Sequence, residues 1–390
     1  MTYDTNNIMR KKPIFWSFQF LLLCLILLMG HSQGMIALFT LFCLLFIPKI
    51  KRMDNVSVLL LLFSIFYVIL SYFNGAFSGT SLLINGLPWF IFYNYGIYLM
   101  NESQSERDLI RLLVIVAFCV GLPVYFSVVQ RIITTGSLVD LSRVFYFANN
   151  EDEKIAGTII CVAIYMGYIG LPAFFLLSKW KPERWLFLLL FVLSILVPIS
   201  VVTRFPIVVS AMCFLLILYL KYKGNTLRLI GIFLLVVGIV FLLYYQGGEV
   251  GQVFEAYSER NDDLENVTTL SSRTMIWTHA LGSLLYYPFG WYGTDNQFSF
   301  MHNMWLDIAR YSGIIPFLLL SAVTIKSFIT NVKILKYSKT SLAYIFLALN
   351  FCFCMVAFVE PVYGSLTVAI GCMVWGMQEA YLNKLKTNRT

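Results

Sequence analysis

The run from Val56 to Phe73, VSVLLLLFSIFYVILSYF, decides the fold class, because its 18 residues are almost wholly apolar and none is charged. A helix needs ~20 such residues to cross the hydrocarbon core of a bilayer. Lys51 and Arg52 stand shortly before the run, as basic residues do on the cytoplasmic side of a membrane helix. We therefore predict a transmembrane helix here, with its N-terminus inside.

Similar apolar runs recur along the 390 residues, of which 59% are hydrophobic, 17% aromatic and 12% charged. This composition leaves a soluble globule too little polar surface. We predict an all-α fold, a polytopic transmembrane helical bundle of about 12 spans that forms a single integral membrane domain over residues 1–390. The predicted spans are residues 14–30, 35–47, 56–73, 82–100, 109–129, 155–177, 185–202, 205–220, 227–245, 303–328, 342–359 and 362–382.

Basic residues are unevenly divided between the two sides of this arrangement. Of the 28 Lys and Arg residues, 21 fall on the side of the N-terminus and seven on the other. Because Lys and Arg in short loops stay in the cytoplasm, both termini are predicted to be cytoplasmic. The net charge of +8 is then a topological signal, so we expect no nucleic acid as partner.

The sequence indicates neither a metal site nor a cofactor. All eight cysteines fall inside predicted spans, which argues against a disulfide framework and a zinc site. The chain also lacks a GxxxxGK[ST] phosphate loop, so nucleotide-driven work is not supported. We expect no metal and no cofactor.

Two segments on the predicted outer side are long enough to hold structure, residues 130–154 and residues 246–301. Function tends to gather in such loops. The second is the large loop between spans 9 and 10. Apolar residues recur in it at helical spacing from Ser272 to Tyr286, which predicts a short helix there.

Three polar residues on the outer side are candidates for chemistry. Arg204, between spans 7 and 8, either reaches lipid headgroups or holds an anionic ligand with its planar fork, and we favour the ligand. Arg273, at the start of the loop helix, either pairs with nearby acidic residues or faces the same space. His302, where the loop re-enters the membrane, is either an interfacial hydrogen-bonding residue or a base for a sugar hydroxyl. His279 is a weaker competitor for that role.

A second group is predicted to bind substrate. An aromatic ring such as Trp277 could stack on a sugar or belong to an interfacial belt. Asp307 and Arg310 are three residues apart on one helix, so a local ion pair is their alternative role. The predicted substrate-binding residues are Asn303, Trp277, Asp307, Arg310 and Arg143.

Taken together, these residues resemble the O-antigen polymerase (Wzy) and O-antigen ligase (WaaL) superfamily of bacterial membrane glycosyltransferases. That family has a Ser/Thr-Arg pair after the seventh span and an Arg ahead of an apolar helix, Pro and Gly in the outer loop. It also has a His-Asn pair separated from a Gly by nine residues. The matching residues here are Thr203, Arg204, Arg273, Pro288, Gly290, His302, Asn303 and Gly313.

The resemblance implies transfer of a glycan from undecaprenyl diphosphate to the next lipid-linked repeat unit, on the periplasmic face of the bacterial inner membrane. It implies that Arg204 and Arg273 neutralise the departing diphosphate while His302 deprotonates the acceptor hydroxyl. Residues 246–301 would then be the large periplasmic loop. The expected partners are the undecaprenyl-diphosphate-linked oligosaccharide and the lipid bilayer, and this interpretation admits a chain-length regulator protein.

Two other functions stay open at this point. An O-antigen ligase would transfer the glycan to lipid A-core, and the resemblance suggests that ligases carry longer insertions than the 29 positions between Arg273 and His302. A transporter or lipid-linked sugar flippase would place charges within its spans. The predicted spans are almost free of charge, so we favour the polymerase.

Overall fold

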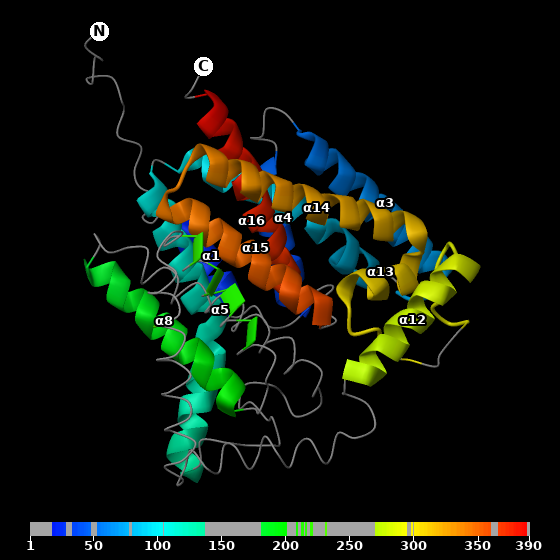
Figure 1. Cartoon of the computed structure of the whole chain (residues 1–390), viewed down its shortest axis with the longest axis horizontal. Coiled ribbons are helices and arrows are strands. Elements are labelled where there is room, and N and C mark those ends of the chain that lie inside the picture. The colour runs from blue at the N-terminus through cyan, green and yellow to red at the C-terminus, as the bar shows by residue number, and fades with distance from the viewer. Residues whose placement is uncertain are drawn as a thin grey trace.

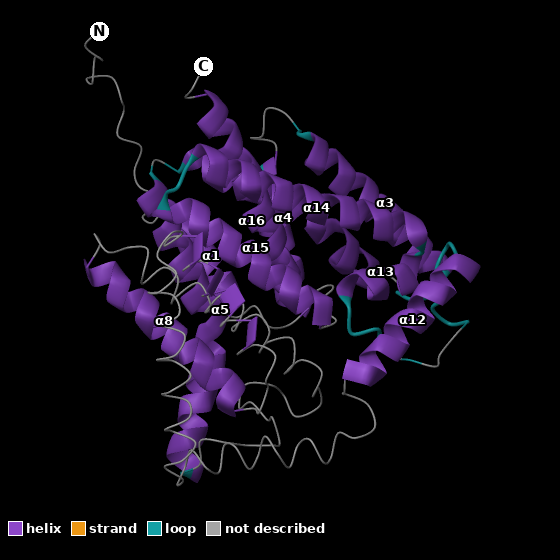
Figure 2. Ribbon diagram, in the orientation of Figure 1, coloured by secondary structure: helices purple, strands orange, loops and turns teal. Residues whose placement is uncertain are grey.

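The computed structural model describes residues 18–28, 33–47, 53–77, 80–103, 105–136, 181–200, 270–294, 298, 300–359 and 366–387, with single positions or pairs between 208 and 231. These residues form helices joined by short loops and contain no strand (Figure 2). The all-α prediction is confirmed for this part of the chain. The helices are α1 (Phe18–Leu28), α2 (Gln33–Leu44), α3 (Asn55–Phe73), α4 (Thr80–Glu102), α5 (Glu106–Thr135), α8 (Lys181–Ser200), α12 (Leu270–Tyr286), α13 (Met304–Ser312), α14 (Ile314–Tyr337), α15 (Ser341–Val359) and α16 (Leu366–Thr387).

Four of the described helices, α3, α5, α14 and α15, are long and apolar enough to cross a membrane. On α3, the large apolar side chains of Leu62, Phe66 and Ile69 stay exposed at the surface of the bundle. Such a surface suits lipid better than water, because apolar atoms lose nothing by facing acyl chains. The chain thus has the apolar helices of a membrane protein, while the count of twelve spans stays a prediction.

Several predicted spans coincide with described helices. Helices α3, α4, α5, α8, α15 and α16 overlap the spans predicted at residues 56–73, 82–100, 109–129, 185–202, 342–359 and 362–382. The span at residues 155–177 lies outside the described residues, and those at residues 205–220 and 227–245 are described only at isolated positions.

The span predicted as one helix over residues 303–328 is wrong, because the structure breaks it at Gly313 into α13 and α14. Gly313 has φ +81°, which favours glycine, and a Cβ there would run into the Pro288 carbonyl and the Phe289 backbone. The N–H of Ile314 donates to the Pro288 carbonyl at 2.8 Å. A contact with the preceding loop therefore ends the helix.

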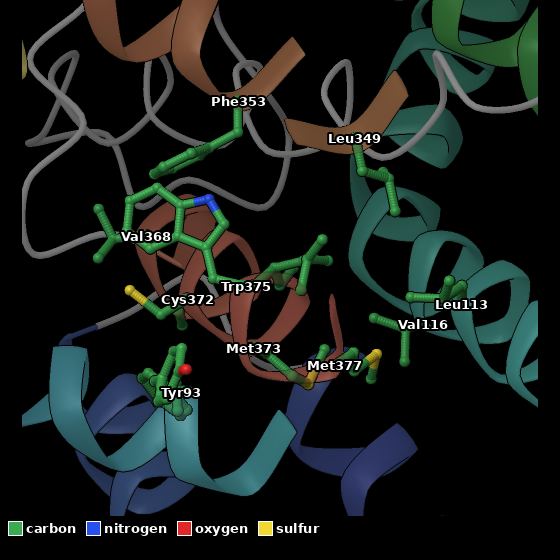
Figure 3. Packing of buried hydrophobic residues seen from close by; sticks show 14 of the residues in the cluster. Tyr93, Leu113, Val116, Leu349, Phe353, Val368, Cys372, Met373, Trp375 and Met377 are labelled. Atoms are coloured by element: carbon green, nitrogen blue, oxygen red, sulfur yellow. The ribbon is translucent and has the colours of Figure 1, made fainter. Parts of the chain in front are cut away.

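The centre of the bundle is the crossing of α4 with α16. A Cβ at Gly96 would meet the Met373 carbonyl, and one at Gly376 would meet the Tyr93 carbonyl, so the two backbones touch where these glycines stand. Small residues permit this close approach between membrane helices. Figure 3 shows buried apolar side chains of α16 packed around the crossing, with Trp375 turned toward Phe353 of α15. Those two rings lie 5.2 Å apart, edge to face.

A buried amide ties α16 to its other neighbours. Asn350 of α15 is wholly buried, and its Oδ1 accepts from Trp375 Nε1 at 2.8 Å and from Ser327 Oγ at 3.3 Å. These donors come from α16 and α14. Such interhelical bonds hold membrane helices together where the hydrophobic effect cannot.

Polar contacts gather at the two ends of the bundle, and α15 connects them. Near its start, Thr340 is 3.2 Å from the hydroxyl of Tyr381, which donates to Glu106. At its end, the Phe358 carbonyl accepts from Asn303 Nδ2 at 3.2 Å. We call the first the basic end, because the Lys and Arg residues at the adjoining helix ends lie there, and the second the site end. The basic residues concerned include Arg107, Arg111, Lys336, Lys339, Lys384 and Lys386.

Candidate functional site

The site end is built from α12 and α13, which lie side by side next to the ends of α3 and α14 (Figure 1). The helix predicted in the outer loop is confirmed as α12. Its buried side joins the residues around α13 in an apolar cluster separate from the main core. The cluster consists of Ile276, Ala280, Leu284, Trp291, Met301, Leu306 and Ala309. This packing fixes α12 against the residues that carry the polar groups.

The side chain of Trp277, on α12, contacts two other segments of the protein. Its Nε1 donates to the Met301 carbonyl at 2.9 Å, and its ring meets Phe358 edge to face at 4.8 Å. The indole therefore joins α12 to the segment before α13 and to the end of α15. Its predicted stacking on a sugar stays a prediction.

Asn303 caps α13. Its Oδ1 accepts from the N–H groups of Trp305 at 3.1 Å and Leu306 at 3.2 Å, which satisfies two donors that a helix start leaves unpaired. Its Nδ2 donates to the Phe358 carbonyl. Both ends of the amide are thus hydrogen-bonded inside the protein, and its predicted contact with substrate stays a prediction.

His302 stands between these fixed residues in a strained conformation. It is the one non-glycine residue with positive φ, +50°, in the described part of the chain. A non-glycine residue there costs of order 1–3 kcal/mol, which the surrounding structure must impose. Its Nδ1 is buried and has no hydrogen-bond partner among the described residues. Strain and an unsatisfied buried polar atom together are typical of functional positions.

Arg273, in the first turn of α12, acts electrostatically on His302. Burial of the imidazole, and then the positive charge of Arg273, lower the pKa of His302 below its usual 6.5. At neutral pH the ring is therefore uncharged and able to accept a proton. The structure brings these two of the three predicted catalytic residues together. Arg204 and Arg143 lie outside the described residues.

Asp307 and Arg310 lie inside the protein, exposed by 0% and 3%. Asp307 Oδ1 accepts from the N–H of Met301 at 2.8 Å, while Oδ2 is buried with no hydrogen bond among the described residues. Burial raises the pKa of Asp307 to about 7, against the backbone hydrogen bonds and the charge of Arg310, which lower it. The Arg310 guanidinium lies 5.0 Å from the centre of the Tyr292 ring. Both residues thus have internal roles, and their predicted contact with substrate stays a prediction.

Asn74, at the end of α3, is a structural residue that the sequence analysis missed. Its Nδ2 donates to the Phe289 carbonyl at 2.6 Å and to the Tyr311 carbonyl at 3.0 Å, which ties α3 to both sides of the site end. The Asn74-Gly75 pair signals the end of a helix. It gives no sign of partners more than 200 positions away.

Arg131, counted in the sequence only as an outer-side basic residue, is almost fully buried at the end of α5. Its guanidinium donates to the Ser200 carbonyl at 3.2 Å, at the last residue of α8. This bond holds the end of α5 to the end of α8. Ser200 lies four positions before Arg204 in the sequence.

Neither similarity to known proteins nor a metal-binding group among the described residues indicates what the site does. No protein-family model matches the sequence, and no curated protein matches it either. Among the described residues, no group of three or more His, Cys, Asp and Glu side chains could hold a metal ion. The geometry around His302 is therefore the basis for a function.

Proposed function

We propose that the chain is an O-antigen polymerase, a membrane glycosyltransferase that moves a glycan from undecaprenyl diphosphate onto the next lipid-linked repeat unit. The observation that carries the proposal is His302, which is held in strained backbone and whose buried Nδ1 has no hydrogen-bond partner in the part of the chain that the structure describes. Burial and the nearby charge of Arg273 lower the pKa of its imidazole. A base and a cation at one place are what glycosyl transfer to a hydroxyl requires when the leaving group is a diphosphate.

In the proposed reaction, the acceptor hydroxyl oxygen attacks the anomeric carbon of the donor sugar. As the new C–O bond forms, the bond between that carbon and the diphosphate oxygen breaks, and His302 takes the hydroxyl proton. Arg273 neutralises the charge that develops on the diphosphate, because its planar fork matches phosphate oxygens. We assign Arg204 the same role. A single displacement inverts the anomeric configuration.

The surface of α12 supports a lipid-linked substrate. Met275, Leu281, Leu285 and Tyr286 are exposed by 57%, 50%, 79% and 83%. An exposed apolar helix face that adjoins membrane-length helices suits the boundary between lipid headgroups and acyl chains. With α12 in that position, Arg273 would stand at the depth of a lipid diphosphate.

The test is lengthening of lipid-linked repeats by the purified protein in proteoliposomes, followed by mass spectrometry of the products. We expect wild-type protein to lengthen them, and His302→Ala, Arg273→Ala and Arg204→Ala to lose ~10²-fold or more of that rate. Arg273→Lys should also lose rate, because it keeps the charge but not the fork. The matched control is His279→Ala, which removes an imidazole from α12, where it lies 3.5 Å from Ser283 Oγ.

The same proteoliposomes distinguish a polymerase from a ligase and from a flippase. Transfer to lipid A-core without lengthening of lipid-linked repeats would make the protein a ligase. Movement of the lipid-linked repeat across the bilayer without lengthening would make it a flippase. Lengthening that survives His302→Ala in folded protein would contradict the assignment of the base.

A further inference from the structure

Both backbone groups of Met301, the residue before His302, are hydrogen-bonded to side chains from different helices. The Met301 carbonyl accepts from Trp277 Nε1 of α12 at 2.9 Å, and the Met301 N–H donates to Asp307 Oδ1 of α13 at 2.8 Å. The Met301 side chain is itself 1% exposed within the cluster between α12 and α13. The position and direction of this residue are therefore fixed from two sides.

The residue after His302 is fixed as well. Asn303 bonds the first N–H groups of α13 with its Oδ1 and the Phe358 carbonyl with its Nδ2. Trp277 packs against the same Phe358. Trp277 and Asn303 thus converge on the end of α15, a membrane-length helix, which gives the segment a rigid support.

His302 carries the strain of this arrangement. A backbone conformation that costs of order 1–3 kcal/mol persists only where the surroundings impose it. The bonds to Met301 and Asn303 supply that constraint, one on each side of the strained residue. Once a bond to Met301 is lost, His302 is free to relax toward negative φ, which would swing the imidazole away from Arg273.

We propose that Trp277 and Asp307 are positioning residues that hold the Met301 peptide so that the His302 imidazole keeps its place beside Arg273. This inference rests on the proposed function for its catalytic meaning. Asp307 contributes one hydrogen-bond acceptor, which an asparagine supplies equally well, and its negative charge is not needed. Trp277 contributes one donor, which phenylalanine removes while an aromatic ring remains to pack on Phe358.

Kinetics give the first half of the test. Asp307→Leu and Trp277→Phe should lower kcat ~10- to 100-fold with KM for the lipid-linked repeat unchanged, because a small displacement of a catalytic group costs that much. Asp307→Asn should stay within ~3-fold of wild type, since it keeps the acceptor. Equal losses in Asp307→Asn and Asp307→Leu would overturn the role of the hydrogen bond.

Chemical labelling gives the second half and does not depend on the reaction. Diethyl pyrocarbonate modifies imidazoles, and mass spectrometry reports the labelling rate of His302 against His279 in the same molecule. We expect that ratio to change at least several-fold in Trp277→Phe and Asp307→Leu and to stay at the wild-type value in Asp307→Asn. An unchanged ratio in folded Trp277→Phe protein overturns the proposal. A wild-type protein that lengthens no lipid-linked repeat refutes the proposed function, while the labelling ratio still decides the positioning.

Discussion

The α4–α16 crossing and the site end differ in what their contacts do: one region is closely packed, and the other holds a strained residue in place. At the crossing, glycines let two backbones touch, and the side chains around them are buried and apolar. At the site end, hydrogen bonds hold a strained histidine whose Nδ1 has no partner among the described residues. Close packing stabilises the crossing. At the site end, the surrounding contacts hold His302 in a backbone conformation that is itself unfavourable. Substitutions in the two regions should therefore differ in what they cost.

The largest effect is expected at the crossing. Gly376→Leu should prevent folding, because its Cβ meets the Tyr93 backbone and neither helix can move without breaking the core. Overpacking typically costs about 1–3 kcal/mol, and it costs more where, as here, the added atoms meet backbone. Size-exclusion chromatography in detergent would report the loss of folded protein. Gly282→Leu on α12 is the matched control, because a Cβ there has no atom within 4 Å. An equal loss of folded protein in both variants would contradict the role of close packing at the α4–α16 crossing.

Substitutions of His302 should separate activity from stability. His302→Ala and His302→Gly both remove the imidazole, so each should lose ~10²-fold or more of the rate. The glycine variant should nevertheless be more stable than the alanine variant by about 1 kcal/mol, because glycine adopts positive φ without penalty. Thermal unfolding of the two proteins measures the difference. A less stable glycine variant would show that the backbone at this position is not strained.

The pH dependence of the rate should reflect the lowered pKa of His302. Since the neutral form is the base, kcat/KM should be level near neutral pH and fall only below the usual 6.5. At pH 6.5 it should still exceed half of its maximum. Arg273→Gln should move the acidic fall to higher pH as well as reduce the rate, because it removes one cause of the lowered pKa. A profile centred at or above 6.5 in wild-type protein would contradict the assignment.

The smallest effect concerns Asp307. Its pKa is raised to about 7 in the folded protein, so its contribution to stability is fully present below the unfolded value of 3.8 and is lost as the pH rises through about 7. Asp307→Asn cannot ionise. Its melting temperature should therefore rise relative to wild type between pH 5 and pH 8, by roughly 1–3 °C. A difference independent of pH would show that Asp307 is ionised in the folded protein across this range.

The sequence predicted the features that depend on local pattern. Helices α3, α12 and α15 follow from apolar runs and helical spacing, and the cap at Asn303 lies at the His-Asn pair that pointed to the site. It also singled out His302 and Arg273, which the structure brings together.

What the sequence could not give depends on contacts between distant segments. The break at Gly313 comes from the Pro288 carbonyl, and a single apolar run gives no sign of it. Asp307 was predicted to bind substrate, with a local ion pair to Arg310 as the alternative, and neither prediction includes the bond from its Oδ1 to a backbone N–H six positions earlier. The close approach of Gly96 to Met373 joins two helices far apart in the sequence, and a glycine within an apolar run does not indicate which helix it will meet.

The position of α16 has a consequence for biosynthesis. It follows every other described helix in the sequence, yet its residues from Leu366 to Gln378 are all buried against earlier helices. A chain made from its N-terminus must therefore complete α4, α14 and α15 before their shared partner leaves the ribosome. Until then Gly96 faces either lipid or a temporary neighbour. Assembly of the bundle should accordingly finish late and in one step, and a stalled chain that ends before residue 366 should remain open to proteases.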